Sequence, residues 1–144
     1  MSTHFSVSIH CLLLLAEGAP ERMTSSLIAS SINTNPVVVR RIMSRLKQAG
    51  LVDSSPGARG FRLSMSSSNI NLKMIYEATK DEGPLFAIHT DSNHNCEVGR
   101  NIDALLDGLY TVAEQKIQAF FETVTLRDLE QALQQRVGQQ SSSV

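Results

Sequence analysis

The sequence predicts a mostly α-helical fold with one short two-stranded hairpin, and three observations lead to this prediction. Apolar residues recur at gaps of three and four along most of the chain, for example from Val39 to Leu46. Residues 55–60 contain one proline and two glycines between two short apolar segments, which is typical of a hairpin turn. The longest periodic stretch, residues 102–124, follows a polar linker. That stretch predicts a long C-terminal helix.

The chain length of 144 residues suits one domain with an oligomerisation arm. Hydrophobic residues make up 42%, which is enough for a core, and no apolar run is long enough to cross a membrane. The N-terminus lacks the basic flank and cleavage site of a secretory signal, so we expect a cytoplasmic protein. The two cysteines, Cys11 and Cys96, cannot form a disulfide framework. A disulfide-stapled secreted domain is therefore excluded.

Charge is distributed unevenly along the chain, although the totals of 13 cationic and 14 anionic side chains nearly balance. Residues 1–64 carry seven Lys or Arg and three Asp or Glu, a net charge of +4, whereas the remaining residues carry six and eleven, a net charge of −5. Six of the seven cations lie within residues 35–62. Such a cluster favours a polyanionic partner, because each neutralised phosphate releases counterions. A solvated basic face explains the charges equally well, so the predicted secondary structure is needed to distinguish these two interpretations.

The first half of the chain predicts three helices. Residues 5–17 are apolar nearly all round and predict a buried helix that includes Cys11 and ends at Gly18. Thr24 is a suitable N-cap for a short second helix, which ends at Asn33, a residue that tolerates the left-handed conformation of a sharp turn. Asn35 is a suitable cap for a third helix over residues 35–49, because Pro36 then occupies the first helical position.

Two short strands follow the third helix, at residues 51–54 and 61–64. Two helices joined by a tight turn and followed by a basic hairpin form the plan of a winged helix-turn-helix domain. In that plan the third helix enters the major groove of DNA by its N-terminal end, and the wing, residues 54–63, lies against the backbone or in the minor groove. The predicted DNA-binding residues are Thr34, Asn35, Val37, Val38, Arg40, Arg41, Arg45, Lys47, Arg59 and Arg62.

The C-terminal part of the chain predicts a dimerisation arm. Asn71 can cap a fourth helix over residues 72–80. The periodic stretch at residues 102–124 most simply buries its apolar face against a second copy of itself, and packing on its own domain is the alternative. The predicted interface residues are Ile102, Leu106, Leu109, Ala113, Ile117, Phe120 and Val124. Thr125 and Asp128 form a capping box for a final helix.

We divide the chain into a winged helix-turn-helix domain at residues 1–80, a linker loop at 81–99, dimerisation helices at 100–138 and a disordered tail at 139–144. A two-fold dimer of such domains reads half-sites about one helical turn apart, so a near-palindromic operator is expected.

The linker contains the candidate sensing residues His89, His94 and Cys96. Their spacing matches no standard zinc finger, and one cysteine is too few for a complete thiolate-held iron–sulfur cluster from this segment of one chain, so we predict no metal and no cofactor. A loop thiol beside His94 and near Arg100 favours thiolate character. Cys96 is therefore our candidate for a redox-sensing thiol, and a solvated loop with incidental histidines is the alternative.

Several segments resemble one bacterial family. The segments are NTNPVVVRRIMSRLKQAGLV, SSPGARGFRL, NINLKMIYEATK and TLRDLEQAL. The chain is similar to the Rrf-two family of winged-helix regulators typified by IscR, NsrR and CymR. The segments NPVVVRRI and PLFAIHTDSNHNCEVGRNI resemble the YwnA-like branch especially. This resemblance implies a dimeric transcription regulator with a recognition helix and a wing on DNA. By position, Arg40 and Arg41 fall where family members place base-reading residues.

Two features depart from the family pattern. Cluster-binding members carry three cysteines in the linker, whereas this chain has Cys96 alone, which argues against an iron–sulfur cofactor. The wing usually contains Gly-Gly-Tyr, whereas this chain has Gly60-Phe61-Arg62, so the contacts of the tip with DNA are expected to differ.

The function that we predict is a dimeric DNA-binding repressor with double-stranded DNA as its partner and a redox signal or small molecule as its effector. The alternative is a winged-helix module that binds a protein instead of DNA. An enzyme is not expected, because the chain has no nucleophile elbow, no phosphate-binding glycine loop and no recognisable pair of catalytic carboxylates.

Overall fold

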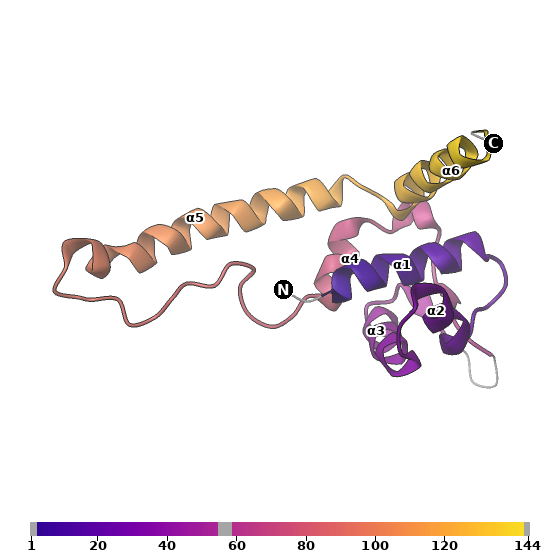
Figure 1. The fold of residues 1–144 in the computed structure, drawn as a ribbon, viewed down its shortest axis with the longest axis horizontal. Helices are drawn as coiled ribbons and strands as arrows, with labels where there is room; N and C mark the ends of the chain where they lie inside the picture. Colours follow the sequence, from indigo (N-terminus) through magenta and orange to yellow (C-terminus); the bar gives the residue numbers. More distant parts are fainter. Residues whose placement is uncertain (1–2, 55–58, 143–144) are drawn as a thin grey trace.

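The fold combines a small helical domain with one long projecting arm (Figure 1). The computed structural model describes residues 3–54 and 59–142. A two-stranded antiparallel sheet interrupts the helices, as predicted. The elements, in chain order, are α1 (His4–Glu17), α2 (Ser25–Ile32), α3 (Pro36–Gln48), β1 (Val52–Asp53), β2 (Arg62–Leu63), the 3-10 turn η1 (Ser67–Asn69), α4 (Leu72–Thr79), α5 (Glu97–Glu122) and α6 (Leu126–Ser142).

One hydrophobic core unites α1 to α4 with the first turn of α6. Leu12 from α1, Ile28 from α2, Met43 from α3, Ile75 from α4 and Leu126 from α6 are all completely buried. Burying a side chain of this size contributes about 1.5–3 kcal/mol. The core therefore fixes how α2 and α3 are presented to the surface. Cys11 is also buried here, as predicted, and burial raises the pKa of its thiol to about 12.

Side-chain caps fix the ends of α2 and α3, as the sequence predicts. Thr24 Oγ1 accepts a hydrogen bond from Leu27 N at 3.2 Å, and Asn35 Oδ1 accepts one from Val37 N at 2.8 Å. Between the two helices, Asn33 adopts the left-handed conformation with φ 63°. The N–H of Thr34 donates to the carbonyl of Ala29. These bonds satisfy the backbone groups of the turn, so the two helices meet at a fixed angle.

The wing is a small sheet whose strands are shorter than predicted. Val52 pairs with Leu63 and Asp53 pairs with Arg62 in antiparallel register. An additional bridge, which the sequence does not predict, joins Met23 to Phe61, and these two residues hydrogen-bond to each other in both directions. The loop before α2 is thus bound to the wing. Residues 55–58 of the predicted turn lie outside the described residues.

The arm consists of α5 and the linker that precedes it. A helix of 26 residues is about 39 Å long, and Figure 1 shows α5 extending away from the domain with the linker beside it. Leu85 N donates to Glu114 Oε1 at 2.7 Å, and the rings of Phe86 and Tyr110 lie 5.2 Å apart. These contacts bind the linker to the helix. The helix begins at Glu97, inside the segment predicted as linker.

The final helix differs from the prediction in two respects. The predicted capping box is present, since Asp128 N donates to Thr125 Oγ1 at 3.1 Å and Thr125 N donates to Asp128 Oδ2 at 2.9 Å. However, α6 packs against α1 and η1 rather than extending the arm. The segment predicted as a disordered tail begins at residue 139, and in the described residues α6 continues as a helix to Ser142. Glutamine favours helices, and Gly138 costs only about 1 kcal/mol inside one.

No helix in the described ranges is long and apolar enough to span a membrane.

Candidate nucleic-acid interface

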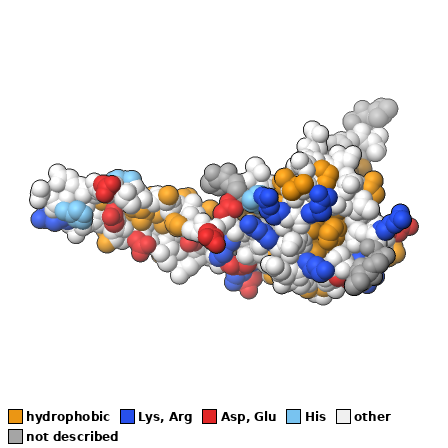
Figure 2. Space-filling model, turned by 90° about the horizontal axis from the view of Figure 1, so that it is seen from below, with side chains coloured by type: hydrophobic (Ala, Val, Ile, Leu, Met, Phe, Trp, Pro, Cys, Tyr) orange, Lys and Arg blue, Asp and Glu red, His pale blue; other side chains and the backbone are white. Residues whose placement is uncertain are grey.

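The surface of α3 carries the first part of the candidate interface. Val39, Ile42, Met43 and Leu46 are buried and hold the helix against the core. Because a helix turns through about 100° per residue, the residues between them point outward. Arg40, Arg41, Ser44 and Lys47 are accordingly exposed. Figure 2, which views the molecule from the side on which α2 and α3 lie in Figure 1, shows Lys and Arg side chains gathered over the domain.

The predicted residues at the N-terminal end of α3 do not all reach the surface equally. Val37 is 49% exposed, and Asn35 is exposed while its side chain caps the helix. Val38 is half-buried and packs against the core, so it presents less surface to a partner. Thr34 is half-buried as well. The exposed set at this end is therefore Asn35, Val37, Arg40 and Arg41.

Two cations at the C-terminal end of α3 contact neighbouring elements. Arg45 Nη1 donates to the carbonyl of Thr79, at the end of α4, over 3.4 Å. Lys47 Nζ donates to Ser54 Oγ at 2.8 Å and to the carbonyl of the same residue at 3.3 Å. Lys47 remains exposed, so it links α3 to the wing while its charge faces solvent. Arg45 is half-buried.

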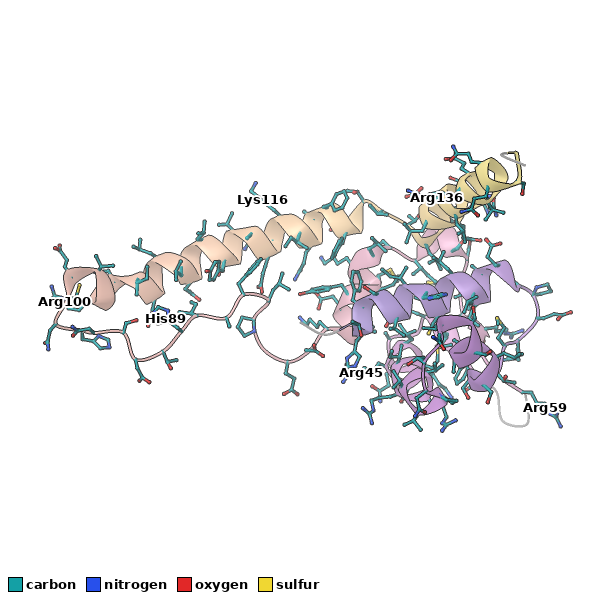
Figure 3. The ribbon with its side chains drawn as sticks, in the orientation of Figure 1. Arg45, Arg59, His89, Arg100, Lys116 and Arg136 are labelled. Atoms are coloured by element: carbon teal, nitrogen blue, oxygen red, sulfur yellow. The ribbon has the colours of Figure 1, made fainter. Side chains whose placement is uncertain are left out.

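The wing carries the remaining predicted cations, Arg59 and Arg62. Arg59 is exposed and projects away from the body of the domain (Figure 3). Arg62 is exposed too, but its Nε donates to Asp53 Oδ2 at 3.2 Å. Asp53 also pairs with Arg22, whose Nη2 lies 2.8 Å from Asp53 Oδ1. Arg62 therefore shares an anion with a second arginine.

The sequence did not predict that Arg22 contributes to the structure of the wing. Its Nη1 donates to the carbonyls of Asp53 at 3.2 Å and of Gly60 at 3.4 Å, so it holds both sides of the wing. Desolvation, the largest single effect on Asp53, favours its neutral form, but hydrogen bonds and charge from Arg22 and Arg62 lower the pKa of this carboxyl overall. No short-range signal marks Arg22, because 31 residues separate it from Asp53.

The arm presents an apolar face that is not covered within the chain. Leu105 is 67% exposed and Phe120 is 61% exposed, and Leu109 and Val112 are exposed between them. Of the predicted interface residues, Leu109 and Phe120 belong to this face, whereas Ile102, Leu106, Ala113 and Ile117 are half-buried. Val124 lies beyond the end of α5 and packs against the core. We call Leu105, Leu109, Val112 and Phe120 the arm face.

Cys96 lies at the start of α5, at the end of the arm farthest from the domain (Figure 1). It is exposed, and the backbone N–H groups of Gly99 and Val98 lower the pKa of its thiol. The N-terminus of a long helix favours an anion in this way. His89 Nε2 lies 3.2 Å from Ser92 Oγ. Within residues 3–54 and 59–142, no group of three His, Cys, Asp or Glu side chains is arranged to hold a metal ion.

Comparisons with known proteins identify the family of this chain. The family profile "Rrf2: Iron-dependent Transcriptional regulator" matches residues 1–132. The chain is 34% identical over 129 residues to YwnA of Bacillus subtilis (strain 168), whose name describes an HTH-type transcriptional regulator, covering 90% of this chain and 96% of that one. A crystal structure of a transcriptional regulator from Lactobacillus plantarum superposes with a TM-score of 0.79 at 26% identity and covers both chains completely.

A second solved structure supports the fold alone. CymR, the global cysteine regulator of B. subtilis, superposes with a TM-score of 0.65 at 22% identity, covering 91% of this chain and 95% of that one. YwnA and the Lactobacillus plantarum protein are named as transcriptional regulators, which have a non-enzymatic function. Among the described residues, no group of three His, Cys, Asp or Glu side chains matches the iron of the family description. With its winged-helix fold and a profile match over residues 1–132, the chain belongs to the Rrf2 (Rrf-two) family of transcriptional regulators.

Proposed function

We propose that this protein is a dimeric repressor that binds a near-palindromic operator in the cytoplasm through α3 and the wing. The observation that supports this proposal most strongly is the exposure of Arg40 and Arg41 beside the exposed Val37, on a helix whose opposite face is buried. Neither arginine forms an ion pair within the described parts of the chain. Their charges are therefore available to a polyanion.

Val37, Arg40 and Arg41 each have a chemical match in the major groove. An arginine side chain donates two parallel hydrogen bonds to the edge of guanine, and a valine methyl contacts the methyl group of thymine. Lys47, at the other end of the helix, suits a phosphate. Arg59 suits the minor groove or its phosphates, because it projects from the wing (Figure 3). Arg62 contributes less, because Asp53 neutralises part of its charge.

The DNA-binding proposal is tested by fluorescence anisotropy on promoter fragments from the source genome. We expect the affinity to fall steeply as the salt concentration rises. Replacing Arg40 and Arg41 by alanine should weaken specific binding by about 30-fold or more, since each bidentate contact contributes about 1–3 kcal/mol. Arg136→Ala is the matched control, because Arg136 lies on α6, far from α3 (Figure 3). Salt-independent binding, or equal losses in both variants, would refute the proposal.

Dimerisation through the arm face completes the proposed function. Exposed leucine, valine and phenylalanine side chains along one helix face are costly in water, and a second copy of the same helix covers them with matching chemistry. A two-fold arrangement places the two α3 helices on successive turns of a duplex. The operator is then expected to consist of two inverted half-sites.

The dimer is tested by light scattering after size-exclusion chromatography. We expect a mass close to twice 15.8 kDa for the wild type and a shift towards 15.8 kDa for Leu109→Asp. Leu27→Asp is the matched control, because Leu27 is 58% exposed but lies on α2. A wild-type mass of one protomer at micromolar concentration would contradict the proposed dimer.

A thiol switch at Cys96 is the regulatory part of the proposal. A peroxide transfers one oxygen atom to the Cys96 thiolate while its O–O bond breaks, which leaves a sulfenic acid and one molecule of water or hydroxide. Cys96 lies between the DNA-binding domain and the arm helix in sequence, and it is the N-cap residue of α5, which carries the arm face, so its oxidation can alter the packing of the two arms and the angle between two domains in a dimer. We expect peroxide to weaken operator binding of the wild type and not of Cys96→Ser. An equal response of both proteins would exclude the switch.

A further inference from the structure

A cavity of about 490 Å³ lies beneath the wing, on the side of α6. Its walls come from the end of α1, the strand β2, the segment before η1 and the first turns of α6. Leu15 and Ala16 supply an apolar part of the wall, whereas Arg62, Ser64, Arg127 and Glu130 supply polar groups. Its size falls in the range of small-molecule sites, which are about 300–1,000 Å³.

Glu130 is the unusual member of this wall. It is only 8% exposed, and its Oε1 atom accepts no hydrogen bond from any described residue. Glu130 also forms no ion pair within the described ranges. A buried carboxylate oxygen without a donor is costly and rare in folded proteins. Glu130 therefore suits a ligand that brings a cationic nitrogen into the cavity.

The two arginines of the cavity wall, Arg62 and Arg127, favour a negatively charged group on the ligand. Arg127 is exposed, lies three residues before Glu130 on α6, and forms no ion pair within the described ranges. Arg62 shares Asp53 with Arg22. A guanidinium group binds a carboxylate in a bidentate manner. The cavity thus combines a site for a cationic nitrogen with a site for a carboxylate, and Ser64 adds a hydroxyl group.

We propose that this cavity binds a small zwitterion of the α-amino acid class, whose ammonium group pairs with Glu130 and whose carboxylate pairs with Arg127. The residues Arg62 and Ser64, which line the cavity, belong to β2 or follow it directly, so an occupant contacts the base of the wing. The binding site is independent of any role in DNA binding. Its regulatory consequence, a change in operator affinity when the cavity is filled, rests on the proposed function.

Calorimetric titration of the full-length chain, without DNA, tests the site. The probes are the proteinogenic L-α-amino acids, each used singly, and for each binder the corresponding amine and carboxylic acid that lack one charged group. We expect at least one amino acid to bind with a Kd below about 1 mM and its two analogues to bind about ten-fold more weakly or worse. Glu130→Gln and Arg127→Gln should each weaken binding by about ten-fold. Glu21→Gln and Arg136→Gln are matched controls, because both residues are exposed and neither lines the cavity.

The outcomes separate the site from the proposed function. The site is overturned if no amino acid binds at about 10 mM, or if binding persists unchanged in both cavity variants. A direct ion pair between Arg127 and Glu130 in solution would also overturn the proposed site. Such a pair would be indicated if Arg127→Gln lowers the thermal stability and the wild type binds no amino acid. Amino-acid binding by a chain that binds no DNA would refute only the proposed function and the regulation that rests on it. Operator affinity that is unchanged by a bound amino acid would refute the regulation alone.

Discussion

Arg22 Nη2 lies 2.8 Å from Asp53 Oδ1, and this ion pair joins the loop before α2 to the first strand of the wing. The same guanidinium donates to the carbonyls of Asp53 and Gly60, on opposite sides of the wing. Arg22 is largely buried, with 17% of its side chain exposed, and so it acts as a rigid brace rather than as a DNA contact. The orientation of Arg59 therefore depends on a residue that lies outside the helix-turn-helix and the hairpin.

Removal of this brace should loosen the wing without unfolding the domain. In Arg22→Ala we expect the amide protons of Met23 and Phe61, which form the bridge beside the wing, to exchange about ten-fold faster in hydrogen-exchange measurements. Operator affinity should fall by about three- to ten-fold, because the wing contributes fewer contacts than α3. Arg136→Ala should leave both quantities unchanged. Exchange rates equal to those of the wild type would show that the wing is held by other contacts.

Acidification should remove the contribution of Asp53 to stability. The folded-state pKa of Asp53 is lowered from its ordinary value of 3.8, so the unfolded chain binds this proton more readily than the folded chain. The ion pairs therefore stabilise the fold at pH values above 3.8, and this stabilisation is lost as the pH falls through the lowered pKa. We expect the difference in Tm between wild type and Asp53→Asn to be constant near neutral pH and to close as the pH falls below 3.8 and through the lowered pKa of Asp53. A difference that widens in acid would contradict this assignment.

Substitution of Gly60 and of Gly50 separates the effect of a close contact from the effect of backbone strain alone. Gly60 has a φ of +90°, and a Cβ atom there would lie 2.2 Å from the carbonyl oxygen of Met23. Gly50 has a φ of +80° but has no atom within 4 Å of such a Cβ. We expect Gly60→Ala to lower the free energy of unfolding by at least about 2 kcal/mol and Gly50→Ala by about 1 kcal/mol, as measured by urea denaturation. Equal effects of the two substitutions would indicate that the backbone at the Met23–Phe61 bridge can move away from the added Cβ atom.

The two cysteines should react at very different rates. Cys11 is completely buried and the pKa of its thiol is raised to about 12, whereas Cys96 is exposed and its pKa is lowered. Because the thiolate is the reactive form, iodoacetamide at neutral pH should alkylate Cys96 at least about 100-fold faster than Cys11. Mass spectrometry of peptides measures both rates. Urea should remove the difference, whereas comparable rates in the folded chain would contradict the position of Cys11 in the core.

The sequence predicted the parts of the fold that depend on local chemistry. The caps at Thr24, Asn35 and Asn71, the left-handed turn at Asn33 and the buried face of α3 follow from residues within a few positions of each other. Helix periodicity and capping are short-range effects, so a single sequence records them. The exposure of Arg40 and Arg41 follows from the same periodicity.

The parts that were missed depend on contacts between distant segments. The bridge from Met23 to Phe61 and the pairing of Arg22 with Asp53 join residues more than 30 positions apart, and no local pattern encodes them. The contacts of the linker with α5, from Leu85 to Glu114 and from Phe86 to Tyr110, also join residues distant in sequence. Periodicity identifies an apolar stripe but does not identify which segment covers it.

Selection of bound genomic fragments tests the central claim most directly. Purified wild-type protein is mixed with sheared DNA from the source genome, and the retained fragments are sequenced. We predict enrichment of one near-palindromic motif with half-sites about one helical turn apart, and loss of this enrichment when Arg40 and Arg41 are both replaced by alanine. Retained fragments without a common motif, or the same motif retained by the double variant, would contradict the claim that α3 reads DNA.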